Sequence, residues 1–173
     1  MAERLSPEVV RKILDFAVEI YDVVIVDMPR DTAAWVMEAV RASTTTLVVM
    51  QNTLAIIRDV KLLLDYMPHA GVDMRKVELI NNRAMAKSQS VSIEQLKQTL
   101  GRERIHRIRN DYHTALAAAD QGMPVYKVSA TSELTEDIRH LANDIWHTHE
   151  PGKKEHRGLL SRLFNNRKAA PKS

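Results

Sequence analysis

The chain has 173 residues, 45% of them apolar and 27% charged, so it is long and apolar enough to fold around a hydrophobic core. It contains no cysteine, which excludes disulfides and thiolate chemistry and favours a cytoplasmic protein. No stretch approaches the roughly 20 apolar residues of a membrane-spanning helix, and the first residues form no apolar signal core.

The net charge of +3 is unevenly distributed. Residues 151–173 hold seven lysines or arginines and one acid, a charge of +6, which leaves residues 1–150 at −3. We therefore divide the chain into a globular part, 1–150, and a basic tail, 151–173. A basic tail on an acidic body predicts a polyanionic surface as the partner of the tail.

The first predicted helix begins at Ser6, a capping residue, and continues with apolar residues at helical spacing to Ile20. It leads directly into Tyr21–Pro29, YDVVIVDMP, whose four consecutive branched aliphatic residues predict a strand buried on both faces of a parallel sheet. Asp27 ends this strand, where open α/β sheets place their ligands. It is either a Walker B-type aspartate that holds the Mg²⁺ of a nucleotide or an ordinary strand end.

Strands and helices alternate along the rest of the globular part. Further strands are predicted at 44–50, 76–81 and 105–108, and further helices at about 32–40, 53–67, 92–101, 111–119 and 132–145. Strands that alternate with helices of this length predict an α/β fold, a partial doubly wound and mostly parallel sheet flanked by helices.

Four stretches resemble, in order and spacing, the carboxyl-terminal half of the MinD/ParA group of P-loop ATPases, and most closely its CpaE/TadZ pilus-assembly branch. Within residues 5–148 they are YDVVIVDMP, LVVMQNTLAIIRDVKLLLD, LINNRAMAKSQSVSIEQLKQTLG and IRNDYHTALAAADQGMPVYK. The resemblance implies a P-loop NTPase-like fold and ATP with Mg²⁺ as cofactors of the complete protein. It also implies a role in the assembly or localisation of a pilus apparatus.

The resemblance assigns roles to individual residues. Asp27 would hold the metal, and Asn82 with Arg83 would hold the adenine, because an asparagine amide offers both a donor and an acceptor to a base. A turn asparagine that closes a strand is the alternative for Asn82. Arg109 stands where the family usually has a proline. Arg58-Asp59 matches a family pair near the dimer face, and a surface ion pair is the simpler interpretation.

The phosphate loop of the family has no counterpart in this sequence. None of the five glycines begins or completes G-x-x-x-x-G-K-[ST] or KGGxGKT. Without backbone amides and a lysine to neutralise the triphosphate, Asp27 would repel the phosphates, so we expect ATP binding by this chain alone to be weak or absent. The chain is thus related to ATPases without an expected activity of its own.

Two interpretations of this missing loop remain. In the first, the initial strand, the phosphate loop and the switch residues lie upstream of Met1 in a longer protein, and in the second the chain is a degenerate relative. The first helix favours the longer protein, because a helix that feeds a parallel strand implies an earlier strand.

The tail contains a short amphipathic segment, HRGLLSRLFNNRK. Its apolar stripe consists of Leu159, Leu160, Leu163 and Phe164, and the basic residues Arg157 and Arg162 flank this stripe. This pattern is typical of a helix in a membrane interface, and it resembles the terminal membrane-targeting helix of MinD. Docking on the chain's own body or on a partner is the alternative. Nucleic acid is not expected, because the body is acidic and the tail lacks interleaved aromatic residues.

Two functional hypotheses follow. The first is a CpaE/TadZ-like positioning ATPase, cytoplasmic and peripheral at the inner membrane, with a second copy, the membrane surface and pilus or secretion components as partners. The second is a non-catalytic interaction module that docks a partner or the membrane through the basic tail. The seven histidines form no metal-binding motif, so we predict no metal ligand other than Asp27.

Overall fold

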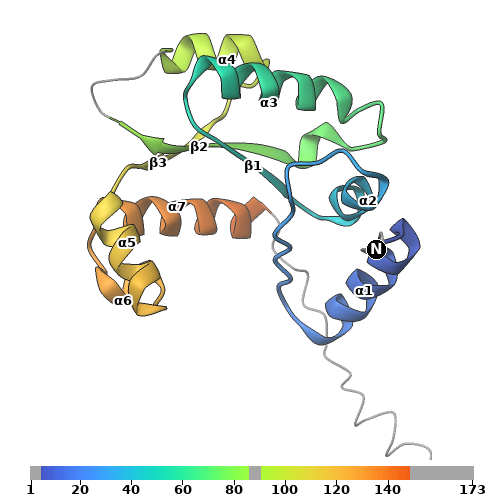
Figure 1. Cartoon of the computed structure of the whole chain (residues 1–173), viewed down its shortest axis with the longest axis horizontal. Coiled ribbons are helices and arrows are strands. Elements are labelled where there is room, and N and C mark those ends of the chain that lie inside the picture. The colour runs from blue at the N-terminus through green and yellow to red at the C-terminus, as the bar shows by residue number, and fades with distance from the viewer. Residues whose placement is uncertain (1–4, 86–90, 149–173) are drawn as a thin grey trace, which may run out of the picture.

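A computed structural model describes residues 5–85 and 91–148 of the chain (Figure 1). In this part three strands form one parallel sheet in the order β1-β2-β3, namely β1 (Thr46–Met50), β2 (Val77–Ala84) and β3 (His106–Arg109). Helices lie on both faces of the sheet, as Figure 1 shows. The predicted α/β fold with a parallel sheet flanked by helices is therefore confirmed.

One face of the sheet is covered by α3 (Leu54–Tyr66) and α4 (Ile93–Leu100), and α2 (Ala34–Ala42) packs at its edge (Figure 1). The main hydrophobic core lies between these helices and the strands. Leu79 of β2 and Leu96 of α4 are completely buried there. Leu79 is central because its strand has a neighbour on both sides and a helix layer above it.

The opposite face of the sheet is covered by α7 (Glu133–Thr148), which follows α5 (Tyr112–Gln121) and α6 (Val125–Val128). Ile80 and Ile108 point to this face and form a smaller core with Leu134 of α7. Successive residues of a strand point to opposite faces, which explains why Leu79 and Ile80 belong to different cores. Arg104 pairs with Asp144 at 2.5 Å and so binds the carboxyl-terminal half of α7 to the loop before β3.

The helix boundaries follow the predicted capping residues. The Oγ of Ser6 accepts a hydrogen bond from the Val9 amide at the start of α1 (Pro7–Ile20). Ser92 and Gln95 form a capping box at the start of α4, with each side chain accepting a hydrogen bond from the backbone amide of the other. α4 ends at Gly101, whose φ of 63° is in the left-handed region that favours glycine.

The prediction of a strand at Tyr21–Pro29 is wrong for this chain. The segment is extended, but it pairs with none of the described strands, and the side chain of Ile25 is 91% exposed. The four branched aliphatic residues are the pattern of a strand with a neighbour on each side. The described part of the chain provides neither neighbour, so the segment connects α1 to α2 without forming the strand.

Several smaller predictions also need correction. β2 extends to Ala84, so Asn82 and Arg83 lie within the strand and not in the loop after it. The short helices η1 (Met74–Lys76) and α6 were not predicted.

The predicted membrane-binding residues of the basic tail lie outside the described residues. Among the helices that the structure does describe, none combines the length and the apolar character needed to span a membrane.

Candidate functional site

The candidate site lies at the carboxyl ends of the three parallel strands, which meet at one edge of the sheet. At this edge β1 leads through Asn52 into α3, β2 ends at Ala84, and β3 ends at Arg109. The side-chain Nδ2 of Asn52 donates a hydrogen bond of 2.7 Å to the carbonyl oxygen of Val91 just before α4. The start of α3 is thereby connected to the segment that precedes α4.

The end of β2 carries a bulge at the two residues predicted to hold adenine. Asn81 pairs with Arg107 and Ala84 with Arg109, so the β2 side has one residue more than the β3 side. Arg83 is the one described non-glycine residue with a positive φ, 53°. The Oδ1 of Asn82 accepts a hydrogen bond of 2.9 Å from the Arg83 amide and so holds this conformation. The side chain of Arg83 is exposed at the strand ends.

Asn81 is a candidate site residue that the sequence analysis missed. Its side chain is almost completely buried, and its Oδ1 has no hydrogen-bond partner among the described residues. A buried amide oxygen without a partner costs about 1–3 kcal/mol, so an asparagine here weakens the isolated chain. The signal in the sequence was a polar residue directly after the apolar residues of β2, at a position that still belongs to the buried strand.

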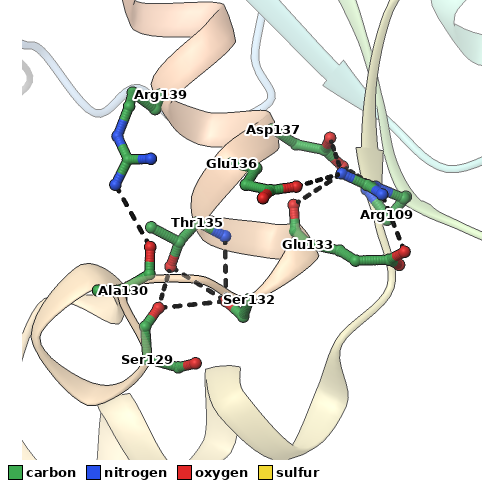
Figure 2. A network of polar contacts seen from close by, with 9 residues as sticks. All are labelled: Arg109, Ser129, Ala130, Ser132, Glu133, Thr135, Glu136, Asp137 and Arg139. Atoms are coloured by element: carbon green, nitrogen blue, oxygen red, sulfur yellow. Dashed lines mark hydrogen bonds and ion pairs between the residues drawn. The ribbon is translucent and has the colours of Figure 1, made fainter.

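At the end of β3, Arg109 is held by the first turns of α7, as Figure 2 shows. Its Nε and Nη2 donate to Asp137 at 2.9 and 2.8 Å, its backbone amide donates to the same carboxylate at 2.7 Å, and its Nη1 pairs with Glu133 at 2.9 Å. These hydrogen bonds with Asp137 raise the pKa of Arg109. Burial acts to raise the pKa of Asp137, but the hydrogen bonds and charge of Arg109 outweigh it and lower the pKa.

Hydrogen bonds also join the turn before α7 to the first residues of that helix (Figure 2). Thr135 is buried, and its Oγ1 donates to the carbonyl oxygen of Ser129 at 2.7 Å, while its amide donates to the Oγ of Ser132 at 3.2 Å. Arg109 therefore connects β3 to a helix start that has hydrogen bonds of its own. Because carboxylates occupy its guanidinium, Arg109 has a structural role here and is not a base-binding residue.

Asp27, the predicted metal ligand, is exposed on the unpaired segment between α1 and α2. No hydrogen bond or ion pair of residues 5–85 and 91–148 joins Asp27 to Asn82 or Arg83, so the structure does not bring the three predicted site residues together. Arg30, three residues after Asp27, pairs with Asp59 of α3 at 2.5 Å and holds the end of the segment. The predicted surface pair of Arg58 with Asp59 is thus replaced by an ion pair between two elements.

The described residues show little that could hold the phosphates or the metal of a nucleotide. At the strand ends the Oδ1 of Asn82 accepts the hydrogen bond from the Arg83 amide. A groove between α3 and α4 has a volume of about 380 Å³, but its lining contains no charged side chain, since it consists of Leu54, Ile57, Val91, Gln95, Gln98 and Thr99. No group of three or more acidic or histidine side chains in residues 5–85 and 91–148 could hold a metal ion. The residues do not fit a triphosphate.

Comparison with known proteins identifies the fold. No protein-family model and no curated protein matches the chain, whereas solved structures do. The chain is similar to a ParA family ATPase from Chlorobium tepidum, with a TM-score of 0.73 and 23% identity over 80% of the chain. It is also similar to the cell division ATPase MinD of Pyrococcus furiosus, with a TM-score of 0.61 and 17% identity over 79% of the chain.

A third similar structure is the septum site-determining protein MinD of Pyrococcus horikoshii, complexed with Mg-ADP, with a TM-score of 0.64 and 18% identity over 80% of the chain. The chain spans only 57%, 59% and 54% of the lengths of these three structures. The similarities therefore show a ParA/MinD-type fold, of which this chain corresponds to a little more than half.

Proposed function

On the premise that the chain folds as part of a ParA/MinD-type ATPase, we propose that it is the carboxyl-terminal portion of such an ATPase, of the CpaE/TadZ kind. The proposed role is the assembly or localisation of a surface pilus apparatus. The observation that supports it is a parallel sheet of ParA/MinD type whose strand ends carry an asparagine bulge but no phosphate-binding group. The four sequence stretches that resemble the CpaE/TadZ branch support the finer assignment.

ATP and Mg²⁺ belong to the proposed complete protein, and the Mg-ADP of the Pyrococcus horikoshii MinD structure supports this extension. In this chain Asn82 and Arg83 would contact the base, and Asp27 would approach the metal once its segment is part of the sheet. We assign no hydrolysis step to the chain, because its residues do not fit the phosphates. Nucleotide would instead promote pairing with a second copy of the complete protein.

The proposed location is the cytoplasmic face of the inner membrane. The basic amphipathic tail supports this proposal through Leu160, Phe164 and the neighbouring arginines. Four apolar side chains at about 1–2 kcal/mol each, less the cost of ordering them, give only marginal binding. A dimer with two tails would bind more firmly.

The alternative is an interaction module without nucleotide-dependent activity. The exposed apolar side chains of α1 and of Tyr21–Pro29 favour it, because such surfaces occur at protein interfaces.

Deletion of the gene tests the pilus role. We expect the deleted strain to lose surface pili, counted by electron microscopy, and to regain them when the intact gene is restored. Normal pili together with misplaced division septa would contradict the pilus role and favour a MinD-like one.

Flotation with anionic liposomes tests membrane binding by the tail. Binding that survives the double substitution Leu160→Asp with Phe164→Asp would contradict the membrane proposal.

A further inference from the structure

His106 of β3 is a nearly buried histidine whose two ring nitrogens both face carboxylates. Its side chain is 8% exposed and lies against α7, which packs on β3. Its Nε2 lies 3.3 Å from the Oε2 of Glu78 on β2, and its Nδ1 lies 3.7 Å from the Oδ2 of Asp144 on α7. Two strands and a helix therefore meet at this one ring.

The hydrogen-bonding capacity of the ring favours its protonated form. A neutral imidazole has one N–H donor and one lone pair, whereas an imidazolium has two donors. Ionised carboxylates only accept hydrogen bonds. A neutral His106 would therefore point a lone pair at either Glu78 or Asp144, while the imidazolium suits both carboxylates.

The charges around the ring favour the imidazolium as well. Glu78 is 27% exposed and pairs with His106, while Asp144 pairs both with His106 and, at 2.5 Å, with Arg104 from the loop before β3. β1 adds no charge, because its residues TLVVM include no titratable side chain. Two carboxylates and one guanidinium sum to −1, and a protonated His106 brings this cluster to zero.

We propose that His106, Glu78 and Asp144 form a pH-sensitive clamp, which holds the carboxyl-terminal half of α7 on the sheet while the imidazole is protonated. Once the ring is neutral, the hold on Asp144 depends on Arg104, and solvent screens this pair because both side chains are about half exposed. The clamp therefore contributes at low pH, and its contribution is lost as the pH rises. Histidine is the side chain whose charge ordinarily changes between pH 5 and 8.

The clamp acts on one end of α7 only. The first turns of the helix are held separately, by Leu134 in the smaller core and by the contact of Asp137 with Arg109. Asp144 lies about two turns further along the helix. Opening of the clamp therefore loosens residues 142–148 and leaves the start of α7 in place. The basic tail follows α7 in the sequence, so the pH acts on the end of the fold from which the tail continues.

Hydrogen exchange of the full chain at pH 6 and pH 8 tests the clamp. The rates are expressed as protection factors, which removes the effect of pH on the intrinsic exchange of amides. We expect the amides of residues 142–148 to lose protection at least about threefold between pH 6 and pH 8. The amides of β2, which lie in the centre of the described sheet, should keep theirs.

Three substitutions separate His106 from the other histidines. His106→Gln should abolish the pH dependence and leave residues 142–148 at the lower protection at both pH values. Glu78→Gln removes one carboxylate and should shift the loss of protection to lower pH. His140→Gln is the matched control, because His140 is an exposed histidine of the same helix, and it should leave the pH dependence unchanged. Circular dichroism confirms that the variants are folded.

Nitrogen NMR of the imidazole of His106 in the unmodified chain provides a measurement that needs no variant. We expect both ring nitrogens to carry protons at pH 6 and one of them to be deprotonated over the pH range in which residues 142–148 lose protection. A neutral ring at pH 6, equal protection at both pH values, or a pH dependence that persists in His106→Gln would overturn the proposal. A pH dependence that disappears in His140→Gln would also overturn it, since it would identify His140 as the group that titrates.

Discussion

At the scale of single residues, the contact between Arg109 and Asp137 joins the end of β3 to α7. Arg109 also pairs with Glu133 and Glu136 of the same helix. The two side chains of the central pair are mostly buried, at 29% and 13% exposure, so this contact is less screened by solvent than a surface ion pair. It stabilises the junction of the sheet with α7.

Asp137→Asn should lower stability in a pH-dependent manner. The pKa of Asp137 is lower in the folded than in the unfolded chain, so its contribution is complete above the unfolded value of about 3.9 and is lost as the pH falls through the folded value. We therefore expect a lower urea midpoint for the variant at pH 7 and a smaller difference from the unmodified chain below pH 4. Glu136→Gln, with its 3.5 Å contact, is the control with a small effect. An equal difference at both pH values would contradict the assignment.

Arg83→Gly should be neutral or stabilising by up to about 1 kcal/mol. Its φ of 53° is in the left-handed region, where a residue with a Cβ is destabilised by roughly 1–2 kcal/mol. Glycine avoids this strain, but its greater conformational entropy in the unfolded chain offsets part of the gain in stability. Urea unfolding measures the change. Arg83→Ala keeps the Cβ and should show no gain. A loss above about 1 kcal/mol for the glycine variant would mean that the Arg83 side chain supports the fold.

The sequence predicted the positions of Asn82 and Arg83 along the chain, but not their local geometry or the contacts of Arg109. Asn82 and Arg83 could be placed at a strand end, because an apolar run followed by polar residues marks that position. Their bulge could not be predicted, since it depends on the pairing of β2 with β3. The partner of Arg109 could not be identified either, because Asp137 is 28 residues away in the sequence.

At the scale of elements, local signals predicted the helices well. Ser6, Thr53, Ser92 and Asp111 cap the helices that they were expected to start or precede. These contacts span three residues and depend little on the rest of the fold. Tyr21–Pro29 behaves differently, because a strand forms only when another strand provides hydrogen-bonding partners. Its apolar composition is therefore typical of a strand, but no strand among residues 5–85 and 91–148 pairs with it.

Ser92→Ala should destabilise the chain by about 1 kcal/mol. The substitution removes one half of the capping box of α4, whose Leu96 and Leu100 complete the main core. We expect a lower urea midpoint with an unchanged slope. Gln98→Ala, at an exposed position of the same helix, should change stability by no more than a few tenths of a kcal/mol. Equal effects of the two substitutions would show that the cap does not control the stability of α4.

At the scale of the whole molecule, the sequence predicted the fold class because alternation of strands and helices leaves few arrangements open. The extent of the sheet was harder to predict. The described sheet contains β1, β2 and β3, with an open edge and an apolar surface beside it. Asp27 lies on the unpaired segment before α2, while Asn82 and Arg83 lie at the end of β2.

Calorimetric titration of the chain with Mg·ATP tests this account most directly. The chain lacks the glycine-rich loop and the lysine that neutralise a triphosphate, and its Asp27 is not held at the strand ends. We predict no binding heat at micromolar concentrations of nucleotide. A micromolar dissociation constant for Mg·ATP would contradict the account in which this chain alone does not hold the phosphates of a nucleotide.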